Sequence, residues 1–364
     1  MIVFFLPDLR AGGAERVMLN LLLRYHYDFP EVKVSLLLFK KEGPLLGEVP
    51  QTIPIYELNT TGASKSVISF VSFCNKLKPN IVFSSLGASL TTSLAKPFIP
   101  NDTVIINRIG NTIGAEKLLF KNSIKRFLYI FANKIIAKMS DHVIFQCNYM
   151  AADYCKETKV TPKHFSIIYN PVKIDHVIDL ASKEIAHRYT FVAVGRLNPQ
   201  KDYKTLIQAA AILKQRKYEF SVAILGDGNL KADLQHQIEK ANLQNEVFLL
   251  GHQANPYPYI KTASYLVSSS LYEGFSNVII ESLCLGTPVV ATNCPGGNAE
   301  VINDGNNGWL CDIKDSEALA NTMLNAMQNE VKDSKKDIMQ KSRLIFSDDL
   351  IFAQYEIVIK KYLV

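Results

Sequence analysis

The chain alternates between short apolar runs and stretches in which apolar residues recur every three to four positions. Short apolar runs bounded by glycine, asparagine, serine or proline are typical of the buried strands of a parallel sheet. The stretches of helical period between them are typical of helices that cover such a sheet. Together they predict an α/β protein built from repeated strand–helix units.

The runs that predict strands fall into two sets, separated by Asn170-Pro171, a pair typical of a corner in the chain. The first set comprises residues 2–6, 32–39, 53–58, 79–85, 104–108, 143–146 and 165–171. The second set comprises residues 189–196, 220–226, 247–251, 264–270, 289–292 and 308–311. Helices are expected over residues 17–23, 66–77, 148–157, 203–216 and 278–285, and a long helical region is expected over 316–361.

A length of 364 residues exceeds one ordinary core, so we expect two domains, residues 1–172 and 173–345, and a terminal segment, 346–364. No run approaches the ~20 apolar residues that span a bilayer. The opening run, 2–6, has no basic stretch before it and predicts a strand, not a signal peptide. The six cysteines are scattered without CxxC spacing, which favours a reducing cytoplasm and disfavours a zinc site.

Positive charge is concentrated in the first half. Residues 1–172 contain 20 Lys and Arg against 12 Asp and Glu, whereas the remainder contains 20 against 22. Either this is ordinary solvated surface, or the first half meets an anionic surface such as phospholipid or a polyprenyl-phosphate carrier.

Residues 116–139 are the most unusual part of this half. Lys117, Lys121 and Lys125 recur every four residues, Arg126 lies beside them, and apolar and aromatic residues fill many other positions. Such a basic amphipathic helix is typical of helices that lie in a membrane interface. The alternative is a core-packed helix with a solvated lysine edge, and the density of aromatic residues favours the membrane.

Two carboxylates mark a strand–loop–helix passage in the second half. Glu273 follows an apolar run in a loop with Gly274, and Glu281 lies eight residues later in a helix that Ser276 or Asn277 is expected to cap. The N–H groups of a helix N-terminus suit phosphate oxygens. Carboxylates suit sugar hydroxyls, from which they accept hydrogen bonds.

Further motifs accompany these carboxylates in order: Gly195-Arg196, Lys201-Asp202, Gly226-Asp227-Gly228 and Gly286-Thr287-Pro288, with Gly12-Gly13-Ala14-Glu15-Arg16 near the start. With these motifs in this order, the chain resembles the retaining glycosyltransferases of family 4. Matching motifs are frequent over residues 189–311 and sparse between 25 and 160. The resemblance implies the GT-B fold, an α/β fold with two doubly wound Rossmann-like domains facing across a cleft. It also implies a C-terminal helix that returns to the N-terminal domain.

The resemblance assigns catalytic roles to three residues. Arg196 and Lys201 would neutralise the departing nucleotide diphosphate, so neither a metal nor another cofactor is expected. Glu273 would contact the donor sugar, and Glu281 would hold the ribose hydroxyls. Retention by front-face attack, in which the leaving phosphate accepts the acceptor's proton, would need no side-chain base.

The other expected donor-binding residues lie in loops at strand ends. The pair Gly12-Gly13 would approach the donor from the opposite domain, although such a pair can also serve the turn alone. The full expected set is Gly12, Gly13, Gly226, Gly251, His252, Gly274, Phe275, Ser276, Asn277 and Glu281.

Asn107 and Arg108 stand at a strand end where many family members carry a histidine that touches the donor sugar. Arg108 would replace that contact by binding a donor or acceptor phosphate, or it would form a structural ion pair.

These features predict a cytoplasmic enzyme at the inner face of the plasma membrane. It would move a hexose or N-acetylhexosamine from a nucleotide sugar, a UDP-sugar before GDP-mannose, to a lipid-linked or oligosaccharide acceptor in polysaccharide or lipopolysaccharide synthesis. Contact with an anionic membrane is expected, and a nucleic-acid partner is not.

Two alternatives compete with this interpretation. A dinucleotide-dependent oxidoreductase is disfavoured because Gly226-Asp227-Gly228 lacks the third glycine of that fingerprint. A catalytically silent nucleotide-sugar-binding or scaffold protein would lack Arg196, Lys201 or Glu273, and all three are present.

Overall fold

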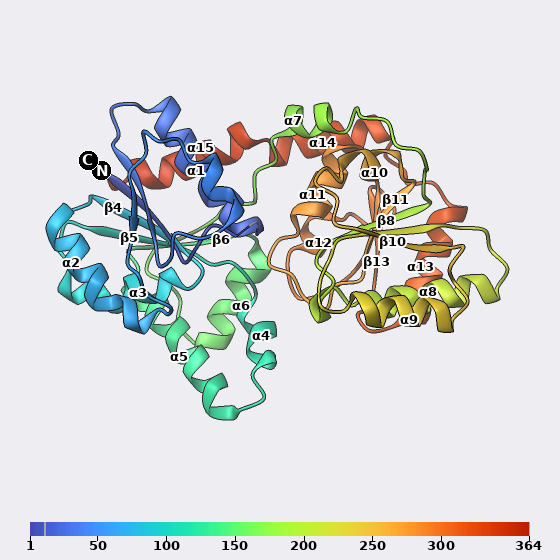
Figure 1. The fold of residues 1–364 in the computed structure, drawn as a ribbon, viewed down its shortest axis with the longest axis horizontal. Coiled ribbons are helices and arrows are strands. Elements are labelled where there is room, and N and C mark those ends of the chain that lie inside the picture. Colours follow the sequence, from blue (N-terminus) through green and yellow to red (C-terminus); the bar gives the residue numbers. More distant parts are fainter. Residues whose placement is uncertain (11, 364) are drawn as a thin grey trace. The chain divides into compact units, whose positions relative to one another are not determined.

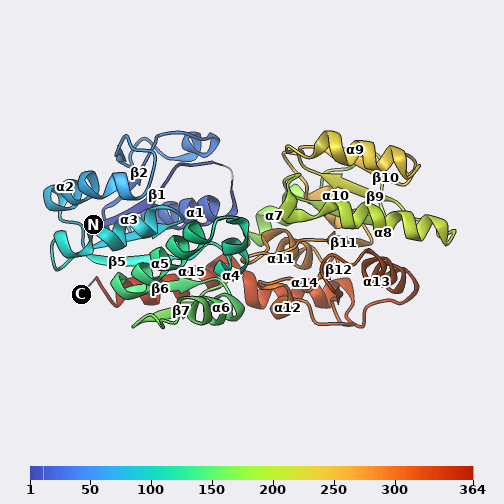
Figure 2. The same ribbon diagram turned by 90° about the horizontal axis from the view of Figure 1, so that it is seen from below.

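The computed structural model describes residues 1–10 and 12–363, and the chain divides into two compact units. Unit 1 comprises Met1–Asn170 and the chain from Ile351 onward; unit 2 comprises Pro171–Leu350. Each unit contains a parallel sheet with helices on both faces (Figures 1 and 2). This confirms the predicted class of an α/β chain with two doubly wound domains.

Unit 1 contains a seven-stranded sheet in the order β3-β2-β1-β4-β5-β6-β7. Its strands are β1 (Ile2–Leu6), β2 (Val34–Leu38), β3 (Ile55–Glu57), β4 (Ile81–Ser85), β5 (Val104–Arg108), β6 (His142–Phe145) and β7 (Phe165–Ile167). Its helices are α1 (Gly13–Asp28), α2 (Val67–Leu77), α3 (Ala88–Ala95), α4 (Ile113–Glu116), α5 (Ser123–Met139), α6 (Asn148–Thr158) and α15 (Asp348–Lys360). The short 3-10 segments are η1 (Pro44–Glu48), η2 (Ser64–Ser66), η3 (Lys96–Phe98) and η4 (Lys117–Leu119).

The central strand β1 divides the core of unit 1 into two layers. Ile2 and Phe4 point into the cluster that contains α1 and α15, whereas Val3 and Phe5 point into the cluster that contains α2 and α3. A strand buried on both faces loses the alternation of apolar and polar residues, which explains the continuous apolar run at 2–6.

The C-terminal helix α15 belongs to the core of unit 1, as the resemblance implied. It buries Ile351, Phe352, Tyr355, Val358 and Ile359 against α1 and the sheet. A helix that begins 181 residues after the end of β7 (348 − 167) therefore completes this unit.

Residues 116–139 do not form the single helix that their periodicity predicted. They divide into α4, η4 and α5, because Phe120 is extended and Asn122 caps α5 by accepting hydrogen bonds from the N–H groups of Ile124 and Lys125. The predicted lysine stripe is broken at this turn. Lys117 turns inward and pairs with Glu157.

Unit 2 contains a six-stranded sheet in the order β10-β9-β8-β11-β12-β13. Its strands are β8 (Phe191–Val194), β9 (Val222–Leu225), β10 (Val247–Gly251), β11 (Tyr265–Ser268), β12 (Val289–Thr292) and β13 (Gly308–Cys311). Its helices are α7 (Ile174–Leu180), η5 (Pro199–Lys201), α8 (Tyr203–Gln215), α9 (Lys231–Lys240), α10 (Tyr257–Thr262), α11 (Asn277–Cys284), α12 (Asn298–Val301), α13 (Ser316–Gln328) and α14 (Lys335–Phe346).

Helices α8 and α9 lie side by side on one face of this sheet, and α13 packs with α8 in the same core (Figures 1 and 2). Helix α11 packs against β11 and β12 and also contacts α10 and α14. The expected long helical region over 316–361 is three helices. Asp315 caps α13, and Ser334 with Asp337 forms a capping box at the start of α14.

Candidate active site

The loops that follow β8 and β9 in unit 2 pack backbone against backbone. Gly226 has a φ of +150°, and a Cβ at this position would lie 2.0 Å from the carbonyl oxygen of Gly195. Only glycine fits such an approach. The close contact brings the Gly195-Arg196 and Gly226-Asp227-Gly228 motifs to one edge of the sheet.

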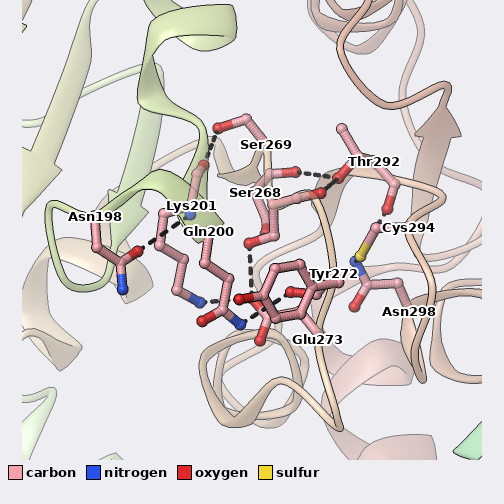
Figure 3. A network of polar contacts seen from close by, with 11 residues as sticks. Asn198, Gln200, Lys201, Ser268, Ser269, Tyr272, Glu273, Thr292, Cys294 and Asn298 are labelled. Atoms are coloured by element: carbon pink, nitrogen blue, oxygen red, sulfur yellow. Dashed lines mark hydrogen bonds and ion pairs between the residues drawn. The ribbon is translucent and has the colours of Figure 1, made fainter. Parts of the chain in front are cut away.

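A network of hydrogen bonds fixes the loop that carries Lys201 to the loop that carries Glu273 (Figure 3). The Gln200 side chain donates to the carbonyl oxygen of Tyr272 over 3.0 Å, and the N–H of Leu271 donates to Gln200 over 2.8 Å. The Ser269 hydroxyl donates to the carbonyl oxygen of Lys201 over 2.8 Å. The two loops therefore act as one support.

Lys201 and Glu273 form the ion pair at the centre of this support. Lys201 Nζ lies 2.6 Å from Glu273 Oε1, and the Ser270 hydroxyl donates to the same oxygen over 2.6 Å. The Lys201 side chain is 19% exposed and that of Glu273 is 9% exposed. A charge-assisted pair this shielded from water holds both groups in a defined geometry.

The loop after β12 closes against the backbone of Glu273. Gly296 has a φ of +141°, and a Cβ there would lie 2.5 Å from the carbonyl oxygen of Glu273. The N–H of Glu273 donates to Pro295 over 2.9 Å, and that of Gly297 donates to Gly274 over 3.0 Å. The paired glycines thus let two strand-end loops meet beside the carboxylate.

The Glu273 carboxylate also affects its buried neighbours. Burial raises the pKa of the Tyr203 hydroxyl, and the negative charge of Glu273 raises it further. Burial likewise raises the pKa of the Cys294 thiol to about 12; the charge of Glu273 adds to this effect and that of Lys201 opposes it. Both groups stay protonated and uncharged at neutral pH, so they add no charge beside the Lys201–Glu273 ion pair.

Helix α11 begins directly after Gly274-Phe275-Ser276. Ser276, one of the two expected cap residues, occupies the N-cap position, but its side chain makes no capping hydrogen bond. Its Oγ is buried without a partner among the described residues. Ile279, Ile280 and Leu283 anchor the helix in the core, leaving its first turn at the loop of Glu273.

Glu281 lies on this helix and is partly buried. Burial raises the pKa of its carboxyl group from 4.5 to about 7, and a hydrogen bond from the Tyr257 hydroxyl, 3.4 Å away, opposes that rise. A carboxylate so near its titration point accepts hydrogen bonds readily only above neutral pH.

Arg196, Gly251 and His252 lie at the strand ends where the sequence placed them. The guanidinium of Arg196 is exposed and makes no ion pair with the residues that the structure describes. Gly251 ends β10 with a φ of +70°, and its carbonyl oxygen accepts a hydrogen bond from Gly226 over 2.8 Å. His252 follows on the surface.

Gly12 and Gly13 lie in unit 1, at the start of α1. Gly12 is the N-cap residue and Gly13 is the first residue of the helix. A Cβ on Gly12 would lie 2.3 Å from Oε2 of Glu15, the end of a flexible side chain that can move aside.

Asn107 and Arg108 are both buried inside unit 1, which disfavours the expected contact with a phosphate. The Asn107 side chain contacts the hydroxyls of four residues: Ser84, Thr92, Ser93 and Ser140. Arg108 donates from Nε to the Tyr355 hydroxyl over 3.1 Å and from Nη2 to Asn170 Oδ1 over 2.5 Å. Among the described residues the guanidinium of Arg108 makes no ion pair, and the uncharged side chains of Tyr355 and Asn170 hold it instead.

Three residues that position the central pair were not predicted from the sequence: Asn198, Gln200 and Ser270. Asn198 caps η5 by accepting a hydrogen bond from the N–H of Lys201. Ser270 ends a run of three serines that begins with the last residue of β11. Polar residues at the end of an otherwise apolar strand were the available signal, but the run was assigned to the strand itself.

The sequence of this chain is similar to those of known glycosyltransferases. The family model described as glycosyl transferases group 1 matches residues 179–344. The chain is 28% identical to the N-acetylgalactosamine-N,N'-diacetylbacillosaminyl-diphospho-undecaprenol 4-alpha-N-acetylgalactosaminyltransferase of Campylobacter jejuni, over 91% of this chain and 90% of that protein. It is 26% identical to the UDP-Gal:alpha-D-GlcNAc-diphosphoundecaprenol alpha-1,3-galactosyltransferase of Escherichia coli, over 81% of this chain and 80% of that protein.

Solved structures extend the likeness to both units. HepE of Anabaena, solved in complex with UDP and glucose, superposes with a TM-score of 0.81 at 19% identity and covers 99% of both chains. At this identity the likeness shows the fold, and that fold is the one the strand order of each unit already indicates.

Proposed function

We propose that this chain is a GT-B glycosyltransferase of the bacterial surface-polysaccharide type, which moves a hexose or N-acetylhexosamine from a UDP-sugar to a lipid-linked saccharide. The acceptor class is proposed because two relatives that align over most of the chain carry undecaprenyl diphosphate in the names of their acceptors. UDP is preferred to GDP because HepE was solved with UDP.

The observation that carries the proposal is the pair of Lys201 and Glu273 at the strand ends of unit 2. A cation beside a carboxylate suits a ligand that presents phosphate oxygens and sugar hydroxyls on adjacent groups. We assign Lys201 and Arg196 to the diphosphate, Glu273 to the donor sugar, and Glu281 to the ribose. The first turn of α11 would add N–H groups toward the phosphate.

We propose that transfer proceeds with retention of configuration. As the bond between the anomeric carbon and the phosphate oxygen breaks, negative charge develops on the diphosphate, and Lys201 with Arg196 stabilises it. The acceptor hydroxyl attacks from the same face and passes its proton to the departing phosphate oxygen. The protein supplies cations for this step, so a divalent metal is not required.

We further propose that the enzyme works in the cytoplasm at the inner face of the plasma membrane, where a nucleotide sugar and a lipid-linked acceptor are both accessible. Contact with an anionic membrane is part of this proposal.

The test is sugar transfer by the full chain, measured by mass spectrometry with a panel of UDP-sugars and undecaprenyl-diphosphate-linked acceptors. Glu273→Ala and Lys201→Ala should each lower turnover by at least about 100-fold, the scale found when one charge-stabilising group is removed. Lys204→Ala, an exposed lysine three residues along, is the matched control and should behave like the natural chain.

Circular dichroism of both variants should match the natural chain, so that the loss is one of chemistry and not of fold. Normal turnover in either variant would refute the assigned site. Slow hydrolysis of the donor without an acceptor would separate an enzyme from a silent nucleotide-sugar-binding protein, which should leave the donor intact.

A further inference from the structure

The segment η4 and the first half of α5 expose a large apolar surface in unit 1. Figure 1 shows these turns of α5 extending away from the sheet. At least half of the surface of six large side chains is exposed, and we call this set the α5 apolar surface: Leu118, Leu119, Ile124, Phe127, Leu128 and Phe131.

The α5 apolar surface is not part of the buried core clusters of unit 1. The second half of α5 buries Asn133, Ile136 and Ala137, and α5 contacts α3. The exposed positions of the first half are spaced as one helical face, on which the rings of Phe127 and Phe131 stack with centroids 6.2 Å apart. Single exposed apolar residues are ordinary, but a contiguous set marks an interaction surface.

The charge around this surface indicates what covers it. Residues 117–140 contain six basic residues and no acidic residue. Lys121 and Lys125 are exposed beside the apolar side chains, whereas Lys117 pairs with Glu157 and Arg126 donates to the carbonyl oxygen of Phe120. Exposed lysines at the border of an apolar face match the anionic headgroups and hydrocarbon of a lipid interface.

We propose that the α5 apolar surface inserts into the interface of an anionic bilayer, with Lys121 and Lys125 at the headgroup level. The apolar side chains supply most of the affinity, and the lysines add a salt-sensitive part. A lysine stripe would instead imply that charge supplies most of the affinity. The inference deepens the proposed function, on which it rests for the choice of a bilayer as the partner. In the described part of the chain, no helix has the length and apolar character to span a bilayer.

A fluorescent reporter tests insertion directly. Trp309, the one tryptophan of the chain, is in the core of unit 2, so Phe127→Trp in a Trp309→Phe background places the reporter on the surface alone. Vesicles of phosphatidylcholine and phosphatidylglycerol should shift its emission to shorter wavelength, and brominated lipid should quench it. Ile68→Trp in the same background is the control, because Ile68 is 84% exposed on α2; it should show neither effect.

Sedimentation with the same vesicles tests the source of the affinity. The triple variant Ile124→Gln, Phe127→Gln, Phe131→Gln should bind at least about tenfold more weakly, because less apolar area leaves water. Lys121→Gln with Lys125→Gln should weaken binding about fivefold per lysine at low salt, and less at high salt. Ile68→Gln with Phe98→Gln, at exposed positions outside this surface, should bind like the natural chain.

Three outcomes would overturn the inference. The natural chain could fail to bind the vesicles, or the triple variant could bind them normally. Light scattering could also show a dimer that the triple variant converts to a monomer, in which case two copies of the chain cover the surface. Stabilisation by UDP in a thermal-shift assay, measured on the same variants, reports on the donor site alone, so failure of the proposed function is distinguishable from failure of this surface.

Discussion

At the residue scale, the site depends on which charges are partnered. Lys201 and Glu273 are held against each other by a network of loop contacts, whereas the guanidinium of Arg196 is in solvent. Glu273 carries a second support from Ser270. The pair is thus pre-organised by its own chain, which limits the ordering that a bound ligand would have to impose.

Glu281 gives a prediction about pH. Its carboxyl pKa is raised to about 7, so the group is ionised at pH 8 and mostly protonated at pH 6. The ionised form accepts hydrogen bonds from ribose hydroxyls better, so the affinity for UDP, measured by calorimetry, should fall as pH decreases through 7.

Glu281→Gln is the control for this titration, because glutamine cannot ionise. A phosphate group of UDP titrates near pH 6, so any slope left in the variant belongs to the ligand. Equal slopes in both proteins would contradict the assignment. The raised pKa also means that the contribution of this group to stability is full below pH 4.5, the ordinary pKa, and is lost as pH rises through about 7.

At the element scale, the strands were the best-predicted part of the fold. The expected run at 2–6 coincides with β1, and those at 289–292 and 308–311 coincide with β12 and β13. These strands are buried on both faces, so their apolar runs are continuous and end at turn residues. For such strands, the pattern of apolar residues is sufficient to predict where the strand begins and ends.

Elements whose limits depend on side-chain contacts were predicted less well. Helix α3 was missed because its buried face is polar: Thr92 and Ser93 contact Asn107 on the neighbouring strand. The break before α5 depends on the cap by Asn122, and the direction of Lys117 depends on Glu157, which lies 40 residues away in the chain. Tertiary contacts of this kind leave no periodic signal in the sequence.

The predicted site residues likewise fall into those that local sequence signals locate and those that depend on tertiary contacts. The strand-end motifs of unit 2 were located correctly because glycines and turn residues mark them, and the Lys201–Glu273 contact follows from two adjacent parallel strand ends. Arg108 was misjudged because sequence does not show that Asn170 and Tyr355, which belong to unit 1 but flank unit 2 in the chain, converge on it.

The docking of α15 gives a prediction about stability. Tyr355→Phe removes the hydrogen bond to Nε of the buried Arg108 and leaves a charged donor unsatisfied. The free energy of unfolding should fall by about 1.5–3 kcal/mol, measured by urea denaturation. Ile357→Ala on the exposed face of the same helix is the control and should change it by less than about 0.5 kcal/mol. Equal effects of the two substitutions would show that the Arg108 contact contributes nothing specific.

At the scale of the whole molecule, the proposed chemistry depends on protein cations and so predicts independence from metal. Transfer should continue within about twofold after treatment with excess EDTA, because Lys201 and Arg196 supply the positive charge that a divalent ion supplies elsewhere. Turnover is measured before and after adding Mg²⁺ or Mn²⁺. A large loss in EDTA that either ion restores would contradict the mechanism.

The place of α15 also sets the order in which the protein assembles during translation. Every strand of the first sheet emerges from the ribosome before unit 2, but that sheet lacks Ile351, Phe352 and Tyr355 until unit 2 has been made. During synthesis, one side of the core of unit 1 therefore remains exposed until α15 is made. Unit 2 can fold as soon as its own residues have been synthesised. Chaperones that bind exposed apolar surface would bind the incomplete unit 1, and they would be released after α15 has been synthesised.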